Sequence, residues 1–507
     1  MKKIFLFLPF LLIGLSCSNI DDVFVPIEQD QEKPTTRGVQ NGIYHSVGVS
    51  YDITDEYLHI DATKFPVVDI GAYLSLSGYP NSYIPNTASE GDILMYAGAT
   101  AKDFLEDINI KTKANRNANF GEIASASLRF ESDMNTKNTY STKYSYARAD
   151  VIKRIKRVYL NATPEMLRPY VYPEFIRDLN IYSPDEFVRR YGTHVLLDIT
   201  IGGKLQFNYR SEIIEESSST QKKLVVESGA KVGIKRFGAD IKNEIDISTL
   251  TQNSNKNAKW DLRVRYIGGA QSGYSASFNS EGYISSSFNI SAWESSVTEI
   301  NAAILEINWE HTYPISDFIA DPVKRVAIEA AIKRYVKQDE VKIVEVKPLY
   351  RMYDEKGCNT YYTSSLDEFN FYRSRHNWKP NYGRTNSHIL GYVFATQQPG
   401  TVPIYRMYSA GLNNTFYSSS LSEANHYLRM GYGWDAGIVG SYIVGYIYST
   451  KREGTEAIQR LFDNARKVQD TMLSVNPSEA QWYLANYKST VKDYGTTNYI
   501  LGYLLLP

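Results

Sequence analysis

The residues best able to perform chemistry are few and scattered. Seven histidines stand at positions 45, 59, 194, 311, 376, 388 and 426, and no neighbouring pair has the spacing of metal ligands. The two cysteines, Cys17 and Cys358, lie too far apart to form a Cys-x-x-Cys site. The chain also lacks a Gly-x-Ser-x-Gly elbow, a phosphate-binding Gly loop and a His-Glu-x-x-His pair. We therefore predict no enzyme, no metal site and no cofactor.

The overall composition excludes one class of partner and favours one class of fold. The 507 residues include 55 Lys and Arg against 56 Asp and Glu, a formal net charge of −1, so there is no net positive charge to attract nucleic acid. The length predicts two to four domains. The 41 tyrosines favour strands over helices, because aromatic side chains fit a pleated, half-buried surface.

The N-terminus has the pattern of an export signal. A basic start is followed by an almost wholly apolar run over residues 4–16, which is too short to cross a bilayer as a helix. Cys17 comes next and resembles the acylated cysteine of a bacterial lipobox, and Asp21 and Asp22 resemble the export tag of surface lipoproteins in Bacteroidota. We predict a signal peptide at 1–16, a lipid-anchored linker at 17–40 and a place on the outer membrane and cell surface, or secretion. The alternative is ordinary cleavage that leaves Cys17 as a free thiol.

The last third of the chain repeats itself. Tyr350-Arg351-Met352-Tyr353 recurs as Tyr405-Arg406-Met407-Tyr408 and, in altered form, as Gln459-Arg460-Leu461-Phe462. Three copies, at about 347–400, 401–454 and 455–507, predict a closed threefold β-structure, since closure removes exposed sheet edges. We predict an all-β domain over 341–507, most simply a β-trefoil, with a three-bladed propeller as the alternative. The copies resemble a bacterial Tyr-Arg-x-Tyr repeat family of accessory modules.

Aromatic side chains of this module are candidates for binding a glycan, because aromatic faces stack on sugar rings. The candidates are Trp378, Trp434, Tyr362 and Tyr417. The alternative is that they form the core under each repeat.

The most specific motif lies in the centre of the chain. Ser183-Pro184 predicts the start of a short helix, which leads to Tyr191-Gly192-Thr193-His194, an apolar strand and the pair Gly202-Gly203. A Gly pair in a strand indicates a bend or a close backbone approach. We expect His194 to form hydrogen bonds at the turn between helix and strand. This pattern resembles the hallmark of the MACPF (membrane attack complex/perforin) family, and the resemblance covers about residues 41–340.

The resemblance implies an α+β fold in which a bent four-stranded antiparallel sheet is flanked by two helical clusters. In that family the clusters unfold into amphipathic hairpins that join a ring-shaped pore. Both candidate segments, 112–148 and 212–258, carry apolar residues that suit a helix and a strand in turn. The candidate inserting residues are Phe120, Ala124, Leu128 and Phe130 in the first segment, and Ile234, Phe237, Ile241, Ile245 and Ile247 in the second.

We therefore expect a pore-forming toxin that is monomeric in solution and assembles as a homo-oligomeric ring on a target membrane of bacterial or host cells, guided by a glycan or surface receptor. Three alternatives remain. The segments could be surface helices that never insert, the protein could be a non-lytic adhesin that binds glycan, or it could be an enzyme whose site leaves no motif.

Overall fold

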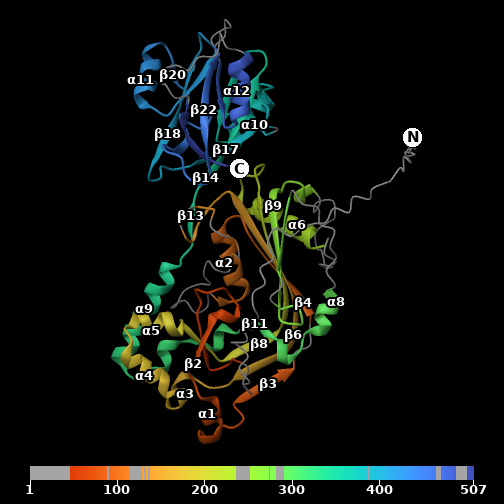
Figure 1. Cartoon of the computed structure of the whole chain (residues 1–507), viewed down its shortest axis with the longest axis vertical. Coiled ribbons are helices and arrows are strands. Elements are labelled where there is room, and N and C mark those ends of the chain that lie inside the picture. Colours follow the sequence, from red (N-terminus) through yellow and green to blue (C-terminus); the bar gives the residue numbers. More distant parts are fainter. Residues whose placement is uncertain are drawn as a thin grey trace, which may run out of the picture.

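The computed structural model describes residues 46–87, 91–114, 128, 130, 133–134, 137–235, 252–272, 275–280, 290–385, 387–463, 470–486 and 500–506. Figure 1 shows two domains stacked along the long axis of the molecule, with the C-terminal domain at one end of a long, curved sheet.

Two long antiparallel strands form the centre of the sheet in the first domain. These are β6 (Tyr144–Leu160) and β8 (Asp198–Glu212), which pair along nearly their whole length. Their outer neighbours change half-way. One half of the sheet adds β4 (Gly91–Gly98), β9 (Ala258–Ile267) and β10 (Ser275–Asn279), and the other half adds β3 (Tyr83–Thr87) and β11 (Ala303–Ile307). Each half thus has the expected four antiparallel strands, with β10 as an additional edge strand in the first.

The change of neighbours coincides with a bend. β6 slips register between Arg154 and Lys156, opposite Gly202 and Ile201. One residue earlier in β8, β11 slips between Ile304 and Glu306, opposite Ile201 and Thr200. A bulge on each side of β8 lets the two flanking strands turn together, because an extra residue bends and twists its strand. Figure 1 shows β6 and β8 curving across the domain.

The second half of the sheet rests on a small mixed layer. Its four strands are β12 (Thr312–Pro314), β7 (His194–Leu196), β1 (Val49–Tyr51) and β2 (Thr63–Pro66), hydrogen-bonded in that order. Helices surround them: α1 (Ile70–Leu76), α2 (Ala101–Lys111), α3 (Pro164–Leu167), α4 (Pro173–Ile181), α5 (Pro184–Tyr191) and α9 (Pro322–Gln338). Together they enclose the larger apolar core of the domain.

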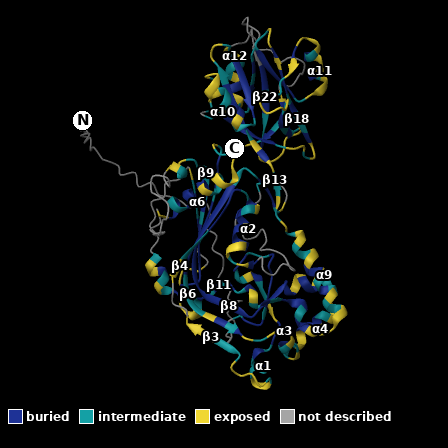
Figure 2. Cartoon of the chain, turned by 180° about the vertical axis from the view of Figure 1, so that it is seen from behind, coloured by how far each residue is buried: buried dark blue, intermediate teal, exposed yellow. Residues whose placement is uncertain are grey.

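The first half of the sheet is covered by helix α6 (Ser219–Lys235) and by α8 (Ile290–Ser296). Alternate residues of β6 and β8 point into this second core, among them Ala149, Leu205 and Phe207. Figure 2 shows the strands as a buried band with exposed helices around it.

The connection to the C-terminal domain is made by two short parallel strands, β5 (Thr139–Ser141) and β13 (Lys342–Val344). Three units with the same order of elements follow. The first contains β14 (Val346–Asp354), β15 (Asn359–Thr363), α10 (Leu366–Arg375), β16 (Lys379–Pro380) and β17 (Ile389–Phe394). The second contains β18 (Thr401–Ser409), β19 (Asn414–Ser418), α11 (Leu421–Arg429), β20 (Gly433–Trp434) and β21 (Ile443–Tyr448). The third contains β22 (Thr455–Asp463), β23 (Asp470–Ser474), α12 (Pro477–Asn486) and β24 (Ile500–Leu505).

The three units close around an axis through their last strands. Strands β17, β21 and β24 pair with one another, each with both of the others. A glycine makes each approach possible: a Cβ on Gly391 would meet Leu504, one on Gly445 would meet Val393, and one on Gly502 would meet Ile447, all within 2.6 Å. The expectation of a purely β domain is wrong in one respect, because every unit also contains a helix of nine or ten residues.

Each helix delivers one carboxylate to a buried arginine of the next unit. The third residues of the helices are Glu368, Glu423 and Glu479, and Ser365, Ser420 or Asn476 caps each helix at its start. These glutamates pair with Arg406 (2.9 Å), Arg460 (2.8 Å) and Arg351 (3.1 Å) in turn. The arginine of the repeated motif is therefore a structural residue that joins neighbouring units.

We predict that Arg406→Ala destabilises the C-terminal domain by about 3 to 5 kcal/mol, because it leaves the buried Glu368 without a counter-charge. Calorimetric unfolding measures the effect as a lowered melting temperature of that domain. The matched control is Arg334→Ala, which breaks a half-exposed pair with Asp185 and should cost at most about 1 kcal/mol. Equal effects of the two substitutions would contradict the prediction.

Candidate functional site

The hallmark turn begins at the end of helix α5. The Ser183 hydroxyl caps this helix by accepting from the backbone N–H of Glu186. The Ser183 N–H in turn donates to the Glu186 carboxylate, which completes a capping box. The helix stops at Gly192, whose φ of 73° favours glycine. A Cβ there would also lie 2.8 Å from the Tyr51 carbonyl oxygen. The glycine therefore lets the chain turn against β1 and enter β7.

Thr193 and His194 fasten this turn to the start of the domain. The Thr193 N–H donates to the Tyr51 carbonyl oxygen (2.8 Å), and the Ile53 N–H donates to the Thr193 hydroxyl (3.1 Å). His194 Nδ1 lies 2.8 Å from that hydroxyl, and its ring contacts Trp309 edge to face. Burial lowers the pKa of His194 to about 4. A neutral, buried imidazole in this position holds the turn in place.

The Gly pair marks a close approach to helix α8. A Cβ on Gly202 would lie 2.0 Å from the Lys153 carbonyl oxygen, so β6 leaves no room for one. A Cβ on Gly203 would lie 2.5 Å from Val297 and 3.1 Å from the ring of Trp293. Trp293 is buried and donates its indole N–H to the Gly268 carbonyl oxygen (3.1 Å). The tryptophan therefore ties the bend to the loop after β9.

Helix α6 covers the apolar face of the sheet beside this bend. Its buried residues are Val225, Val226, Ser228, Gly229, Ala230, Gly233 and Ile234. Ile234, a candidate inserting residue, is fully buried in the core that includes Leu205 and Phe207. Within the second candidate segment, Ser219–Lys235 thus form a helix packed on strands.

The sequence of α6 itself has a second period that the sequence analysis missed. From residue 224 to 234 the even positions are apolar or small: Leu224, Val226, Ser228, Ala230, Val232 and Ile234. Charged residues occupy odd positions, at Lys223, Glu227, Lys231 and Lys235. Eleven residues with this alternation match the length of a membrane-spanning strand. This period-two alternation was the signal that could have added the even positions of α6 to the candidate inserting residues.

The remaining inserting candidates divide into two groups. Leu128 and Phe130 are buried in the larger core, where Phe130 packs against Tyr146 and lies under the guanidinium of Arg210 (4.9 Å). The other six, together with the acylation candidate, lie outside the described residues: Phe120, Ala124, Phe237, Ile241, Ile245, Ile247 and Cys17.

Two of the four glycan candidates are inaccessible. Tyr362 and Tyr417 are fully buried around the threefold axis, where the Tyr417 hydroxyl accepts from the Tyr362 N–H (2.7 Å). The Tyr362 hydroxyl accepts in the same way from the Leu473 N–H (2.7 Å). The prediction that these tyrosines contact a ligand is wrong, because the repeated aromatic position points toward the axis.

The two tryptophans do not occupy equivalent positions. Trp434 lies opposite Met407 on β18, while the residue opposite Met352 on β14 is Pro380. Trp378 instead packs against Tyr361 and Tyr372 and is partly buried. Trp434 is partly exposed on the surface of the second unit, so it alone of the four could offer a ring face of this kind to a ligand.

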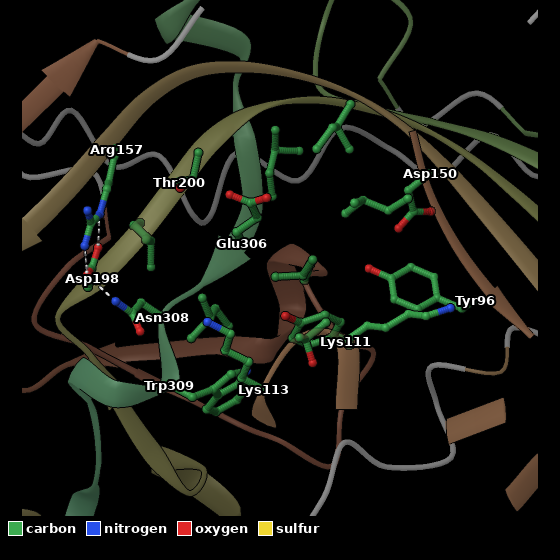
Figure 3. A pocket seen from close by; sticks show the side chains of 18 of the residues that line it. Tyr96, Lys111, Lys113, Asp150, Arg157, Asp198, Thr200, Glu306, Asn308 and Trp309 are labelled. Atoms are coloured by element: carbon green, nitrogen blue, oxygen red, sulfur yellow. Dashed lines mark hydrogen bonds and ion pairs between the residues drawn. The ribbon is translucent and has the colours of Figure 1, made fainter. Parts of the chain in front are cut away.

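A cavity of about 620 Å³ lies on the polar side of the bent sheet. Figure 3 shows Arg157, Asp198 and Asn308 at one end and Tyr96 and Asp150 at the other. Several charges in its wall are paired: Arg157 with Asp198 (2.6 Å), Glu306 with Arg154 (2.6 Å) and Asp150 with Arg148 (2.5 Å). Within the described residues, no group of three or more His, Cys, Asp or Glu side chains could hold a metal. The helices in that part of the chain are also too short or too polar to span a membrane.

Comparison with known families agrees with this geometry. Residues 92–343 match the MAC/Perforin domain, a range that includes the hallmark turn, the bent sheet and α6. The chain contains a MAC/Perforin domain. Residues 348–490 match DUF5648, a domain of unknown function. A comparison with curated protein sequences finds no match.

Solved structures with similarity to the chain share low sequence identity with it. A MAC/Perforin-domain protein from Bacteroides thetaiotaomicron is 17% identical, with a TM-score of 0.48, over 66% of this chain and 69% of that one. GNIP1Aa from Chromobacterium piscinae is 18% identical, with a TM-score of 0.43, over 74% and 67%. The cytotoxin suilysin from Streptococcus suis is 11% identical, with a TM-score of 0.23, over 50% and 48%.

We predict that Gly203→Val destabilises the MAC/Perforin domain by about 2 kcal/mol or more, because the added side chain overlaps Val297 and Trp293. Denaturant unfolding with tryptophan fluorescence measures the loss. Gly411→Ala is the control, since a Cβ at Gly411 has no neighbour within 4 Å and should change stability little. A Gly203→Val protein as stable as the wild type would show that the approach of α8 does not need a glycine.

We also predict that His194 makes the MAC/Perforin domain less stable in acid. Above pH 6.5 the imidazole is neutral in both states, and it contributes no pH dependence. Between pH 6.5 and about 4 only the unfolded chain gains the proton, so the free energy of unfolding falls by about 3 kcal/mol in total. Comparing wild type with His194→Gln across this range isolates the contribution. Parallel pH curves for the two proteins would contradict the prediction.

Proposed function

We propose that the protein forms pores by inserting the segment that contains α6 into a target membrane. The observation that carries this proposal is the double pattern of α6. As a helix it buries Val226, Ala230 and Ile234 on the sheet, and as a strand it would place the same residues on one lipid-facing side.

The central strands already have the alternation of a pore wall. On one face of β8 lie Leu205, Phe207 and Tyr209, which α6 covers. On the other face lie Lys204, Gln206 and Asn208, all buried. If α6 unfolded to extend this sheet, the apolar face would meet lipid and the polar face would line an aqueous channel.

The position of the C-terminal domain supports the direction of insertion. Tyr392 donates a hydrogen bond to Glu212, the last residue of β8 (3.1 Å). Lys143, which precedes β6, donates to the Leu506 carbonyl oxygen (2.9 Å). The domain therefore sits at the end of the sheet from which new hairpins would grow, where it would meet a membrane first.

The wider function follows from this proposal. The protein would be monomeric in solution and assemble into a homo-oligomeric ring on bacterial or host cells, without an enzymatic activity or nucleic-acid partner. It would reach the cell surface as a lipoprotein acylated at Cys17, or be released. The C-terminal domain would be a variant of the β-trefoil that docks on the target.

A second candidate function is a non-lytic adhesin. It is favoured by the partly exposed Trp434, because an accessible ring face could stack on a sugar. In that case the MAC/Perforin domain would serve as a rigid scaffold.

A disulfide between α6 and the sheet tests the pore proposal. An ideal Cβ at position 233 lies 3.6 Å from Leu262 Cδ2 on β9, so Gly233→Cys and Leu262→Cys place two thiols near each other. We predict that residues 18–507 with this disulfide release no dye from liposomes or related bacterial cells. Reduction should restore the leakage, because α6 can then leave the sheet.

The controls for this experiment are the two single-cysteine variants, all in a Cys358→Ser background that removes the other thiol of the described chain. Leakage that persists with a verified crosslink would show that α6 need not unfold. An absence of leakage from wild-type protein, combined with retained glycan binding, would favour the adhesin.

A further inference from the structure

The second unit of the C-terminal domain carries an exposed group of apolar side chains that we call the apolar edge: Trp434, Ile438, Val439 and Tyr442. Their exposed fractions are 37%, 48%, 47% and 40%. Trp434 and Tyr442 stack at 4.5 Å between ring centroids, and Tyr405 packs against both rings. The stack supports the base of the loop that presents the two aliphatic residues.

The first unit shows that this surface is not required by the fold. Gly383 in the first unit and Gly437 in the second are equivalent residues. Each donates its N–H to the side chain two residues earlier, Asn381 or Asp435. Counting from these glycines, Arg384 and Thr385 stand where the second unit has Ile438 and Val439. His388 likewise stands at the place of Tyr442. The second unit thus has exposed apolar residues at positions where the first unit has polar ones.

Tyr405, which packs against Trp434 and Tyr442, also makes different contacts from its counterpart in the first unit, Tyr350. In the first unit, Tyr350 is buried and donates a hydrogen bond to the Ile214 carbonyl oxygen of the MAC/Perforin domain (2.8 Å). Its counterpart Tyr405 is only partly buried and lies beside the apolar edge. The position that holds the two domains together in the first unit is therefore turned outward in the second.

Charge is nearly absent from the segment that carries the apolar edge. Residues 430–448 contain one charged side chain, Asp435, and it pairs with Arg406 (3.2 Å). The corresponding residues 376–394 of the first unit include Lys379 and Arg384. A segment without free charge offers no attraction of its own to anionic headgroups. Trp and Tyr beside aliphatic residues are instead typical of side chains that sit at the boundary between headgroups and acyl chains.

We propose that the apolar edge inserts shallowly into the uncharged boundary layer of a lipid bilayer and so docks the protein before any hairpin inserts. The proposal rests on the proposed function, since it names the surface by which the pore-forming protein first meets its membrane. Figure 1 places α11 and β20 in the half of the C-terminal domain farther from the MAC/Perforin domain. This half faces the side toward which hairpins from β6 and β8 would grow.

Flotation with phosphatidylcholine vesicles tests the proposal. Residues 18–507 serve as the protein, because they lack the predicted acylated cysteine, which would bind membranes by itself. We expect the wild type to float with the vesicles and its partition to change by less than about twofold between low salt and about 0.5 M NaCl. The double substitution Ile438→Ser and Val439→Ser should lower the partition by about tenfold or more.

Matched variants separate the apolar edge from general surface hydrophobicity. Ile300→Ser removes a more exposed aliphatic residue of the MAC/Perforin domain, and Tyr382→Ser removes an exposed residue of the first unit's corresponding loop. Both should bind as the wild type does. Because Ile438 and Val439 are exposed, the double variant should keep the wild-type melting temperature, and Trp434→Gln provides an independent loss of binding.

The proposal would be overturned if the wild type did not float, or if the double variant and Trp434→Gln floated as the wild type does. It would also be overturned by binding that needs anionic lipid and disappears in salt. Binding that needs a glycolipid and is competed by free sugar would overturn it as well. Dye release is measured in parallel. Flotation that depends on the apolar edge without any leakage would support this docking surface and contradict pore formation. Leakage with no dependence on the edge would do the reverse.

Discussion

The first domain depends on a close approach that only glycine permits. Trp293 and Val297 lie where a side chain of residue 203 would be, and the Lys153 carbonyl oxygen lies where one of residue 202 would be. The bulges in β6 and β11 occur at the same level, so all three strands bend together. Without this bend α8 could not reach the sheet, and the core shared with α6 would lose its cover at one end.

The same core bears on the proposal that α6 leaves the sheet. Four of its seven buried residues are Ser228, Gly229, Ala230 and Gly233, which bury little apolar surface. The free energy gained by burying a side chain grows with its apolar area, so the helix depends mainly on Val225, Val226 and Ile234. Small residues let the helix lie close to the sheet, and they also limit the cost of removing it. This packing supports the proposal that α6 is ordered in one state and released in another.

The sequence predicted those features that depend on local backbone requirements. The helix start at Ser183, the turn at Gly192 and the bend at the Gly pair each follow from residues close in the chain. The helices of the C-terminal domain were not predicted, although Ser365 and Ser420 each precede a glutamate by three residues, in the pattern of a capping box that indicates a helix start. The burial of the axial tyrosines could not be predicted from the sequence. Tyrosine is a residue type that often contacts ligands, and only the closure of the three units shows that Tyr362 and Tyr417 meet at an axis.

This closure separates structural residues from those free to change. The positions that join units are the arginine, its glutamate partner and the axial glycine, and all three units keep them. The first residue of the repeated motif is outside that set. It is Tyr350 at the contact between domains, Tyr405 beside the exposed rings of the second unit, and Gln459 in the third. Because the interior fixes the arrangement of the units, their outer surfaces can diverge without loss of the fold. The differences between the units, and not their shared motif, are therefore where binding functions should be sought.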